Sequence, residues 1–185
     1  VPALRVRRRS GVWPIVVGSS TARGQRLLAW LTRAFSVAVA AWLVAYAVAG
    51  PAAVGVIALP PSVADTALAA GWSLVGASLA LLVLAQGQMG AAWRIGIDAR
   101  ATPLVTHGLY GVVRNPIYSA MDLVLAGVVL VAPSPWSLAA ALGVAVALAV
   151  QTRLEEQHLL GLHGPTYRAY DARVGRFVPG LGRLR

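Results

Sequence analysis

Long stretches of this chain contain no charged residue, and these neutral stretches define its predicted elements. No Asp, Glu, Lys or Arg occurs in residues 34–64, 66–93 and 123–152. A helix needs about 20 predominantly apolar residues to cross the hydrocarbon core of a bilayer. A soluble core helix of ordinary length does not require such long neutral runs. The pattern therefore predicts an all-α, polytopic bundle of membrane helices.

Prolines mark the ends of the predicted spans. Four spans are expected, over about residues 29–49, 67–89, 117–132 and 136–151. Gly50-Pro51 interrupts the first, because proline removes a backbone hydrogen bond and clashes with the preceding turn. Pro133-Ser134-Pro135 separates the last two, which are short for a bilayer but can cross with tilt or local thinning. They predict a C-terminal helical hairpin, followed by a polar tail helix over about residues 153–172.

The net charge of +10 is carried by arginine alone, since the chain contains no lysine. In a soluble protein this charge would raise the question of nucleic acid. Here the arginines gather in residues 1–33, 90–116 and 153–185, and the turns at 60–66 and 133–135 contain none. Basic loops stay in the cytoplasm, so we expect four crossings and no nucleic-acid partner. A fifth crossing at residues 52–59 is the alternative, although it would break the alternation of basic and non-basic loops.

This distribution of charge also predicts the domain organisation. Residues 1–28 form a basic cytoplasmic or interfacial arm, and residues 29–185 form a single membrane domain. Both termini are then cytoplasmic, in a membrane that we take to be the bacterial plasma membrane. Cysteine is absent, which excludes disulfides, thiolate metal sites and a Cys nucleophile. The histidines (His107, His158 and His163) lack the spacing of a metal site, so no metal is expected.

The first group of polar residues that needs an explanation runs from Thr106 to Tyr118. Asn115-Pro116 is a helix-entry signal, with Asn as N-cap and Pro at the first helical position. The N-terminus of a helix attracts anions, and Arg114 adds a planar cation suited to carboxylate or phosphate. Gly108 allows close approach of the backbone to a ligand. The run is therefore a candidate ligand site at the cytoplasmic end of the third span.

The second group is the acidic pair Glu155-Glu156, where the fourth span leaves the bilayer. Taken alone, the pair is more typical of a solvated helix with local Glu–Arg contacts. The predicted hairpin, however, returns the pair to the face on which residues 106–118 lie. A cluster of polar groups over apolar helices is the expected site for a polar ligand that acts on a lipidic partner.

The combined pattern resembles a known family. His-Gly-x-Tyr-x-x-x-Arg-Asn-Pro-x-Tyr, then an apolar hairpin, then Glu-Glu and a Tyr-x-x-Tyr tail, is similar to the integral-membrane methyltransferases. These comprise the isoprenylcysteine carboxyl methyltransferases and the phospholipid N-methyltransferases. The resemblance covers about residues 86–180, and its matching positions are His107, Gly108, Tyr110, Arg114, Asn115, Pro116, Tyr118, Glu155 and Glu156. Asn115 stands where some members have His.

The resemblance implies an enzyme that binds S-adenosyl-L-methionine at the cytoplasmic membrane surface, through about residues 90–180. The implied cofactor-binding residues are His107, Gly108, Leu109, Tyr110, Arg114, Asn115, Pro116, Tyr118, Glu155 and Glu156. Arg114, Tyr118 and Glu155 are the implied catalytic residues. The acceptor would be lipidic or hydrophobic: an isoprenylcysteine-like carboxylate, a lipid amine or a small hydrophobic group. Methyl transfer is a direct displacement that needs positioning and exclusion of water, which agrees with the absence of a visible protein nucleophile.

Two other interpretations stay open at the level of sequence. An NADPH-dependent membrane reductase of the sterol-reductase type shares the architecture of the C-terminal region. A non-enzymatic membrane protein could use the basic loops to bind anionic lipid, but Gly108, Tyr110 and Tyr118 would then have no task. The oligomeric state is also open, because the glycines between Gly71 and Gly76 suit packing against a partner or within the chain.

Overall fold

The computed structural model describes residues 44–90 and 103–183, together with residues 30, 33, 37, 38 and 40–42. Within these ranges the chain consists of α-helices, 3-10 turns and loops, with an isolated bridge between Val113 and Gly175 in place of strands. The predicted all-α membrane helix bundle is confirmed. The N-terminal arm at 1–28 and the arginines at 94 and 100 lie outside the described residues.

In the part of the chain that the structure describes, two helices are long and apolar enough to cross a membrane: α3 (Pro61–Met89) and α5 (Pro135–His163), each of 29 residues. Only 11% of the apolar window of α3 and 17% of that of α5 is buried within the protein. Apolar helices that bury so little against protein need an apolar solvent, which the bilayer supplies. Two shorter apolar helices accompany them, Ala40–Ala49 and α4 (Pro116–Val131).

The boundaries of two helices differ from the predicted ones. α3 begins at Pro61 rather than near residue 67, because a proline in the first helical turn lacks only an N–H that would be unsatisfied anyway. α5 continues past residue 151 through the acidic pair to His163. Residues 52–59 contain only the 3-10 turn η1 (Ala52–Val54), and Ile57 donates its N–H to the carbonyl of Pro133 at 2.8 Å. This segment is too short to be the fifth crossing considered above.

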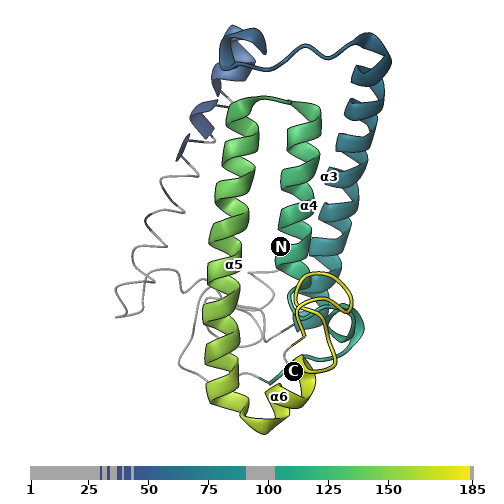
Figure 1. Cartoon of the computed structure of the whole chain (residues 1–185), viewed down its shortest axis with the longest axis vertical. Coiled ribbons are helices and arrows are strands. Elements are labelled where there is room, and N and C mark those ends of the chain that lie inside the picture. The colour runs from purple at the N-terminus through teal and green to yellow at the C-terminus, as the bar shows by residue number, and fades with distance from the viewer. Residues whose placement is uncertain are drawn as a thin grey trace. The chain divides into compact units, whose positions relative to one another are not determined.

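The chain divides into two compact units, and α3, α4 and α5 each contribute to both. In the unit that contains residues 122–148, the predicted hairpin is visible as α4 and α5 joined by a short corner (Figure 1). Ser134 and Ser137 hold this corner, because each donates its N–H to the other's hydroxyl, at 3.0 and 2.9 Å. This reciprocal arrangement satisfies amides at the start of α5 that would otherwise lack partners.

Two glycines allow close packing of α3 on α4 in the same unit. A Cβ added to Gly71 would lie 2.8 Å from the carbonyl oxygen of Gly127, and one added to Gly127 would lie 2.8 Å from that of Gly71. Small residues at such a crossing let two backbones approach. Gly71 thus packs within the chain, whereas a Cβ on Gly76 would meet nothing within 4 Å.

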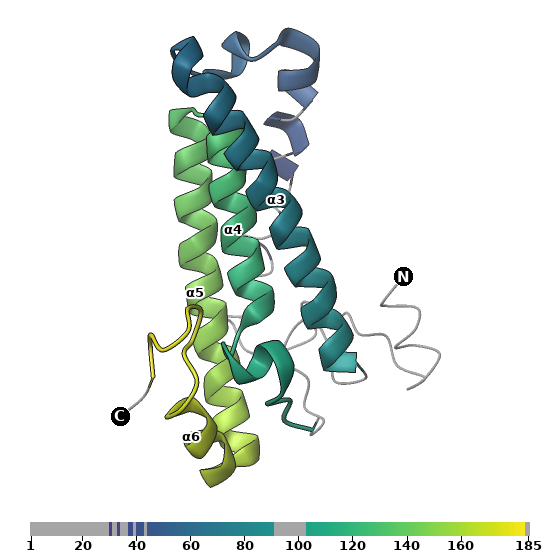
Figure 2. The same cartoon turned by 90° about the vertical axis from the view of Figure 1, so that its right-hand side faces the viewer.

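In the second unit, the chain folds back on itself after α5. Gly164 adopts a positive φ of 50°, and the short helix α6 (Pro165–Asp171) follows. Tyr167, Tyr170 and Val174 form a buried cluster there, with Leu104, Leu159 and Leu160 against it. Figure 2 shows α6 and the C-terminal loop beside the turn that precedes α4. This unit contains most of the residues that the sequence singles out.

Candidate active site

The start of α4 confirms the predicted helix-entry signal. The helix begins at Pro116, and the carbonyl of Asn115 accepts the first of its backbone bonds, from Ser119 N at 3.0 Å. The Asn115 side chain, however, does not cap the helix. Its Nδ2 donates to Glu156 Oε1 at 3.2 Å and to the Arg176 carbonyl at 3.3 Å. Asn115 therefore joins the beginning of α4 to α5 and to the tail.

Glu156 lies at the centre of a buried charge network. Arg114 donates to its Oε1 from Nε at 3.1 Å and from Nη2 at 3.0 Å, and Arg176 Nη2 lies 2.7 Å from its Oε2. The side chains of Arg114 and Glu156 are only 1% and 9% exposed. A buried carboxylate of this kind is tolerated only when it is paired and hydrogen-bonded. Here two arginines and an asparagine fulfil that condition.

The remaining donors of Arg114 bind backbone carbonyls of the tail. Nη1 donates to Asp171 at 2.9 Å and to Val174 at 2.7 Å, and Nη2 donates to Gly182 at 3.1 Å. A guanidinium has five N–H groups, and these bonds together with those to Glu156 use all five. Direct binding of an anionic ligand by Arg114 would require replacement of one of them. The geometry favours Arg114 as a residue that positions the site.

A short backbone pairing holds the tail against the loop before α4. Arg114 N donates to the Gly175 carbonyl at 2.8 Å, and Asn115 N donates to the Arg176 carbonyl at 3.1 Å. Ser119 Oγ then donates to the Phe177 carbonyl at 2.7 Å. A side chain at Gly175 would collide with the Val178 carbonyl oxygen, so this position requires glycine for the close approach. We call residues 174–182 the tail strap.

Glu155 belongs to a separate cluster. Its Oε1 accepts hydrogen bonds from Tyr118 Oη at 2.6 Å and from Gln151 Nε2 at 2.7 Å. His158, one turn further along α5, interacts with it electrostatically. The Glu155 side chain is half-buried, unlike that of Glu156. The pair that stands together in the sequence therefore provides one structural carboxylate and one that solvent or a ligand can reach.

The loop at His107 is anchored by a residue of α3. Leu109 N donates to Gln88 Oε1 at 2.7 Å, and Gly108 has a φ of +60°. A Cβ at Gly108 would lie 2.7 Å from the Gln88 Cδ atom, so the positive φ selects glycine and the Gln88 side chain packs against it. His107 is exposed at the beginning of the 3-10 turn η3 (Gly108–Gly111). The exposed imidazole leaves this edge of the loop open to a ligand.

Tyr110 fixes the same loop from its buried side. Its hydroxyl lies 3.5 Å from the Ala85 carbonyl, and its own carbonyl accepts a hydrogen bond from Tyr170 Oη at 2.6 Å. Burial raises the pKa of Tyr110 well above its ordinary range and that of Tyr170 to about 12. Both phenols are therefore neutral donors at physiological pH.

The two polar groups predicted from the sequence thus meet in space. Three of the predicted residues (Arg114, Asn115 and Tyr118) bond directly to Glu155 or Glu156. The His107 loop reaches the cluster through Tyr110 and Tyr170, and Pro116 is fully buried. Three residues of the site were not predicted from the sequence: Gln88, Gln151 and Arg176. Gln88 and Gln151 could have been predicted as site residues, because each is a polar residue within a stretch that contains no charge.

Comparison with known proteins gives one match. The family model described as phospholipid methyltransferase matches residues 67–166, which is more than half of the 185 residues. This range contains all of α4 and α5 and most of α3, as well as the His107 loop and both acidic residues. No curated protein and no solved structure matches the chain.

Proposed function

Because the chain belongs to the phospholipid methyltransferase family and is a membrane methyltransferase, we propose that it transfers a methyl group from S-adenosyl-L-methionine to a lipidic acceptor. The observation that carries the proposal is the half-buried Glu155 carboxylate, oriented by Tyr118 Oη at 2.6 Å and Gln151 Nε2 at 2.7 Å. An oriented, partly accessible carboxylate just beyond the apolar part of α5 suits a ligand that offers hydroxyl or ammonium donors.

The chemistry of this donor set fits S-adenosyl-L-methionine. That molecule offers ribose hydroxyls and an ammonium group as donors, and Glu155 is an acceptor for either. It also offers acceptors on its adenine and carboxylate, for which the exposed His107 ring is a donor. The residues thus match both the charge and the hydrogen-bonding character of the cofactor.

The predicted site residues divide into two roles under this proposal. We assign Glu155, Tyr118, His107, Gly108 and Leu109 to direct contact with the cofactor. The predicted residues that are buried or fully bonded within the chain are assigned to positioning: Tyr110, Arg114, Asn115, Pro116 and Glu156. Positioning matters in this reaction because a displacement at carbon depends on the alignment of the reacting atoms.

When bound, S-adenosyl-L-methionine supplies a methyl group activated on a sulfonium sulfur. The chain itself then has three tasks. Glu155 holds the cofactor from one side, with its own orientation fixed by Tyr118 and Gln151. The Glu156 network and the tail strap keep the loop at Arg114 closed over this end of α4. The apolar helices exclude water from the reaction and admit an acceptor from the bilayer.

The proposal extends to location and acceptor. The acceptor is a lipid or membrane-partitioned molecule: a lipid amine, an isoprenylcysteine-like carboxylate or a small hydrophobic group. The basic loops favour a cytoplasmic position for the site and for both termini, in four crossings of a bacterial plasma membrane. The excess of arginine is assigned to this orientation and not to nucleic acid.

Thermal unfolding tests the cofactor assignment. The detergent-purified protein is heated with S-adenosylhomocysteine, with NADPH or with neither, because a ligand that binds only the folded state raises the midpoint. We expect a rise with S-adenosylhomocysteine alone. A rise with NADPH alone would support the reductase interpretation and contradict the proposal. In parallel, isotope from methyl-labelled S-adenosyl-L-methionine should appear in the lipid extract of membranes that contain the protein.

A further inference from the structure

An apolar groove runs between α4 and α5 in the unit that contains residues 122–148. Its volume is about 420 Å³, within the range of about 300–1,000 Å³ that is usual for small-molecule sites. On α4 it is lined by Leu125 and Val129, and on α5 by Leu138, Leu142 and Ala145. Leu138 and Leu142 are 50% and 60% exposed, so the groove is open along one side. In a membrane helix such an opening faces lipid chains.

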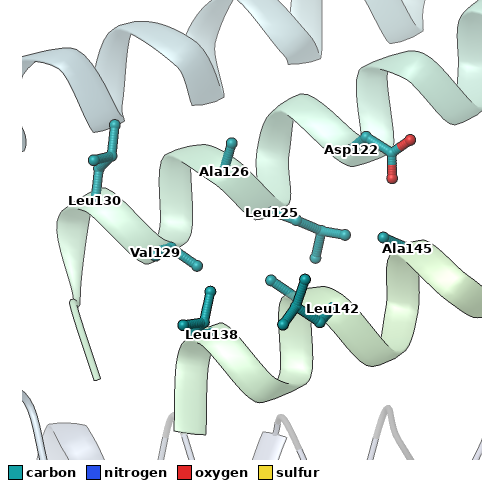
Figure 3. A pocket seen from close by; sticks show the side chains of 9 residues that line it. Asp122, Leu125, Ala126, Val129, Leu130, Leu138, Leu142 and Ala145 are labelled. Carbon is teal, nitrogen blue, oxygen red and sulfur yellow. The ribbon is translucent and has the colours of Figure 1, made fainter. Parts of the chain in front are cut away.

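A single acidic residue, Asp122, stands at one end of this groove (Figure 3). Figure 3 shows its carboxylate directed towards Ala145, while Leu130 and Leu138 lie at the opposite end. The other eight lining residues are Leu, Val or Ala. Asp122 is thus the only lining residue that can carry a charge, and the groove pairs an apolar length with one anionic end.

The Asp122 carboxylate lacks a partner within the described part of the chain. Its Oδ1 atom is buried and accepts no hydrogen bond from the residues described. A buried polar atom normally has a partner, and an ionisable residue within a membrane helix usually marks a ligand or ion pathway. Asp65 provides a contrast, because it is exposed in the first turns of α3 and lies outside the groove.

We infer that this groove binds the hydrocarbon chain of a lipid whose polar end carries an ammonium group, with the Asp122 carboxylate as its counter-charge. The apolar lining fits the chain, and the unpaired anion fits the cation. A carboxylate-bearing lipid would place two like charges together, which disfavours it. The inference rests on the proposed function in one respect: the bound lipid is taken to be the methyl acceptor, which makes Asp122 the residue that selects an amine over a carboxylate.

Photo-crosslinking in maltoside micelles tests this site without the cofactor. Three diazirine probes of equal chain length end in a primary amine, an alcohol or a carboxylic acid, and mass spectrometry maps the labelled peptides. In the wild-type protein we expect the amine probe to label α4 and α5 about tenfold more than the acid probe, as one charged hydrogen bond provides. Equal labelling by the three probes, or labelling outside these helices, would overturn the inference.

Matched variants distinguish the contribution of the Asp122 charge to probe labelling from the contribution of the shape of the groove. Asp122→Asn should reduce amine labelling to the level of the alcohol probe, whereas Asp65→Asn, which removes the same charge elsewhere, should leave it unchanged. Ala145→Leu fills the groove and should reduce labelling by all three probes. Ala139→Leu adds the same side chain to α5 outside the groove and should not. Amine labelling that survives Asp122→Asn at the wild-type level contradicts the assignment of the counter-charge.

The cofactor assay on the same preparations keeps the two proposals distinguishable. A wild-type sample that S-adenosylhomocysteine stabilises, but that the three probes label equally, rejects the groove and leaves the methyltransferase proposal intact. Selective amine labelling without stabilisation by S-adenosylhomocysteine supports the groove and counts against the proposed cofactor. Each variant is scored only after its unliganded midpoint has been shown to match that of its control.

Discussion

Glu155 and Glu156 are adjacent in α5 but accept hydrogen bonds from different donors. Glu155 binds Tyr118 and Gln151, whereas Glu156 binds Arg114, Asn115 and Arg176. Adjacent residues of a helix point about 100° apart, which follows from 3.6 residues per turn. The two carboxylates thus face different surroundings, and substitutions at the two positions should have different effects.

Glu155→Gln should weaken the binding of S-adenosylhomocysteine while the fold is retained. Gln keeps the size of the side chain but removes the charge, and a hydrogen bond to a charged group contributes about 1.5–3 kcal/mol. We therefore expect a loss of at least about tenfold in affinity, measured by titration of the thermal shift. Gln157→Ala, an exposed position on the same helix, serves as the control. Unchanged affinity in Glu155→Gln would place the cofactor elsewhere.

Glu156→Gln should instead lower stability before any ligand is added. The change leaves Arg114 and Arg176 without their shared anion, and loss of one partner of a buried pair costs about 3–5 kcal/mol. The readout is the unfolding midpoint in detergent, with Glu155→Gln as the reference. The double variant Glu156→Gln, Arg176→Gln should recover part of the loss, because one uncompensated cation has been removed. A midpoint equal to that of the wild type would show that the network is not needed for folding.

Tyr118→Phe should show how much the orientation of the Glu155 side chain contributes to cofactor binding, separately from its charge. The Glu155 carboxylate remains, but it loses the donor at 2.6 Å, and Gln151 alone then orients it. The expected result is weaker cofactor binding, by about 1 kcal/mol or roughly fivefold, with no added loss in a Tyr118→Phe, Glu155→Gln double variant. Additive losses in that double-mutant cycle would mean that the two residues act independently.

Gly175→Ala should disrupt the tail strap. The added methyl group would collide with the Val178 carbonyl oxygen, and the backbone bond from Arg114 N to the Gly175 carbonyl would shift with it. We expect a lower midpoint and faster proteolysis after residue 172. Gly161→Ala is the matched control: its Cβ would meet nothing within 4 Å in α5, so it should be neutral or slightly stabilising. Equal behaviour of the two variants would contradict the role of the strap.

Alkaline pH should loosen the unit that contains the strap. Burial raises the pKa of Tyr110 and Tyr167 far above the ordinary value and that of Tyr170 to about 12. These phenols stabilise the fold while they are protonated. Their contribution is fully present below the unfolded pKa of about 10, and it is lost as pH rises from there towards the folded values. Phenolate absorbance against pH should show this transition, and Tyr170→Phe should make the loss of stability less steep.

Much of the fold follows from the positions of neutral runs and prolines. The hairpin at Pro133–Pro135 and the start of α4 at Pro116 are found where the sequence places them. The extension of α5 to His163 does not follow from the sequence, because a polar tail with helical character is compatible with either a continuous or a broken helix. Gly164 ends the helix, and only the three-dimensional arrangement shows that the chain reverses there.

The candidate site is predicted less completely than the fold. Arg114 and both glutamates are predicted to lie together, and they do meet. The sequence does not distinguish the carboxylate that is saturated by arginines from the one that is open, because that difference depends on the orientation of each side chain in α5. Arg176 and the carbonyls of the strap were beyond prediction, since long-range pairing of a loop leaves no periodic signal. Asp122 was not predicted as a site residue, although a single acid within an apolar segment is a signal that the sequence carries.

The bonds of Arg114 have a consequence for biosynthesis. Its Nη1 and Nη2 atoms donate to carbonyls at Asp171, Val174 and Gly182, which lie 57 to 68 positions further along the chain. A ribosome adds about 5–20 residues per second. The Arg114 guanidinium therefore lacks these carbonyl acceptors for several seconds after α4 has been synthesised. During that interval the guanidinium can bind phosphate groups at the membrane surface. Lipid headgroups would then act as temporary partners in assembly, until the strap displaces them.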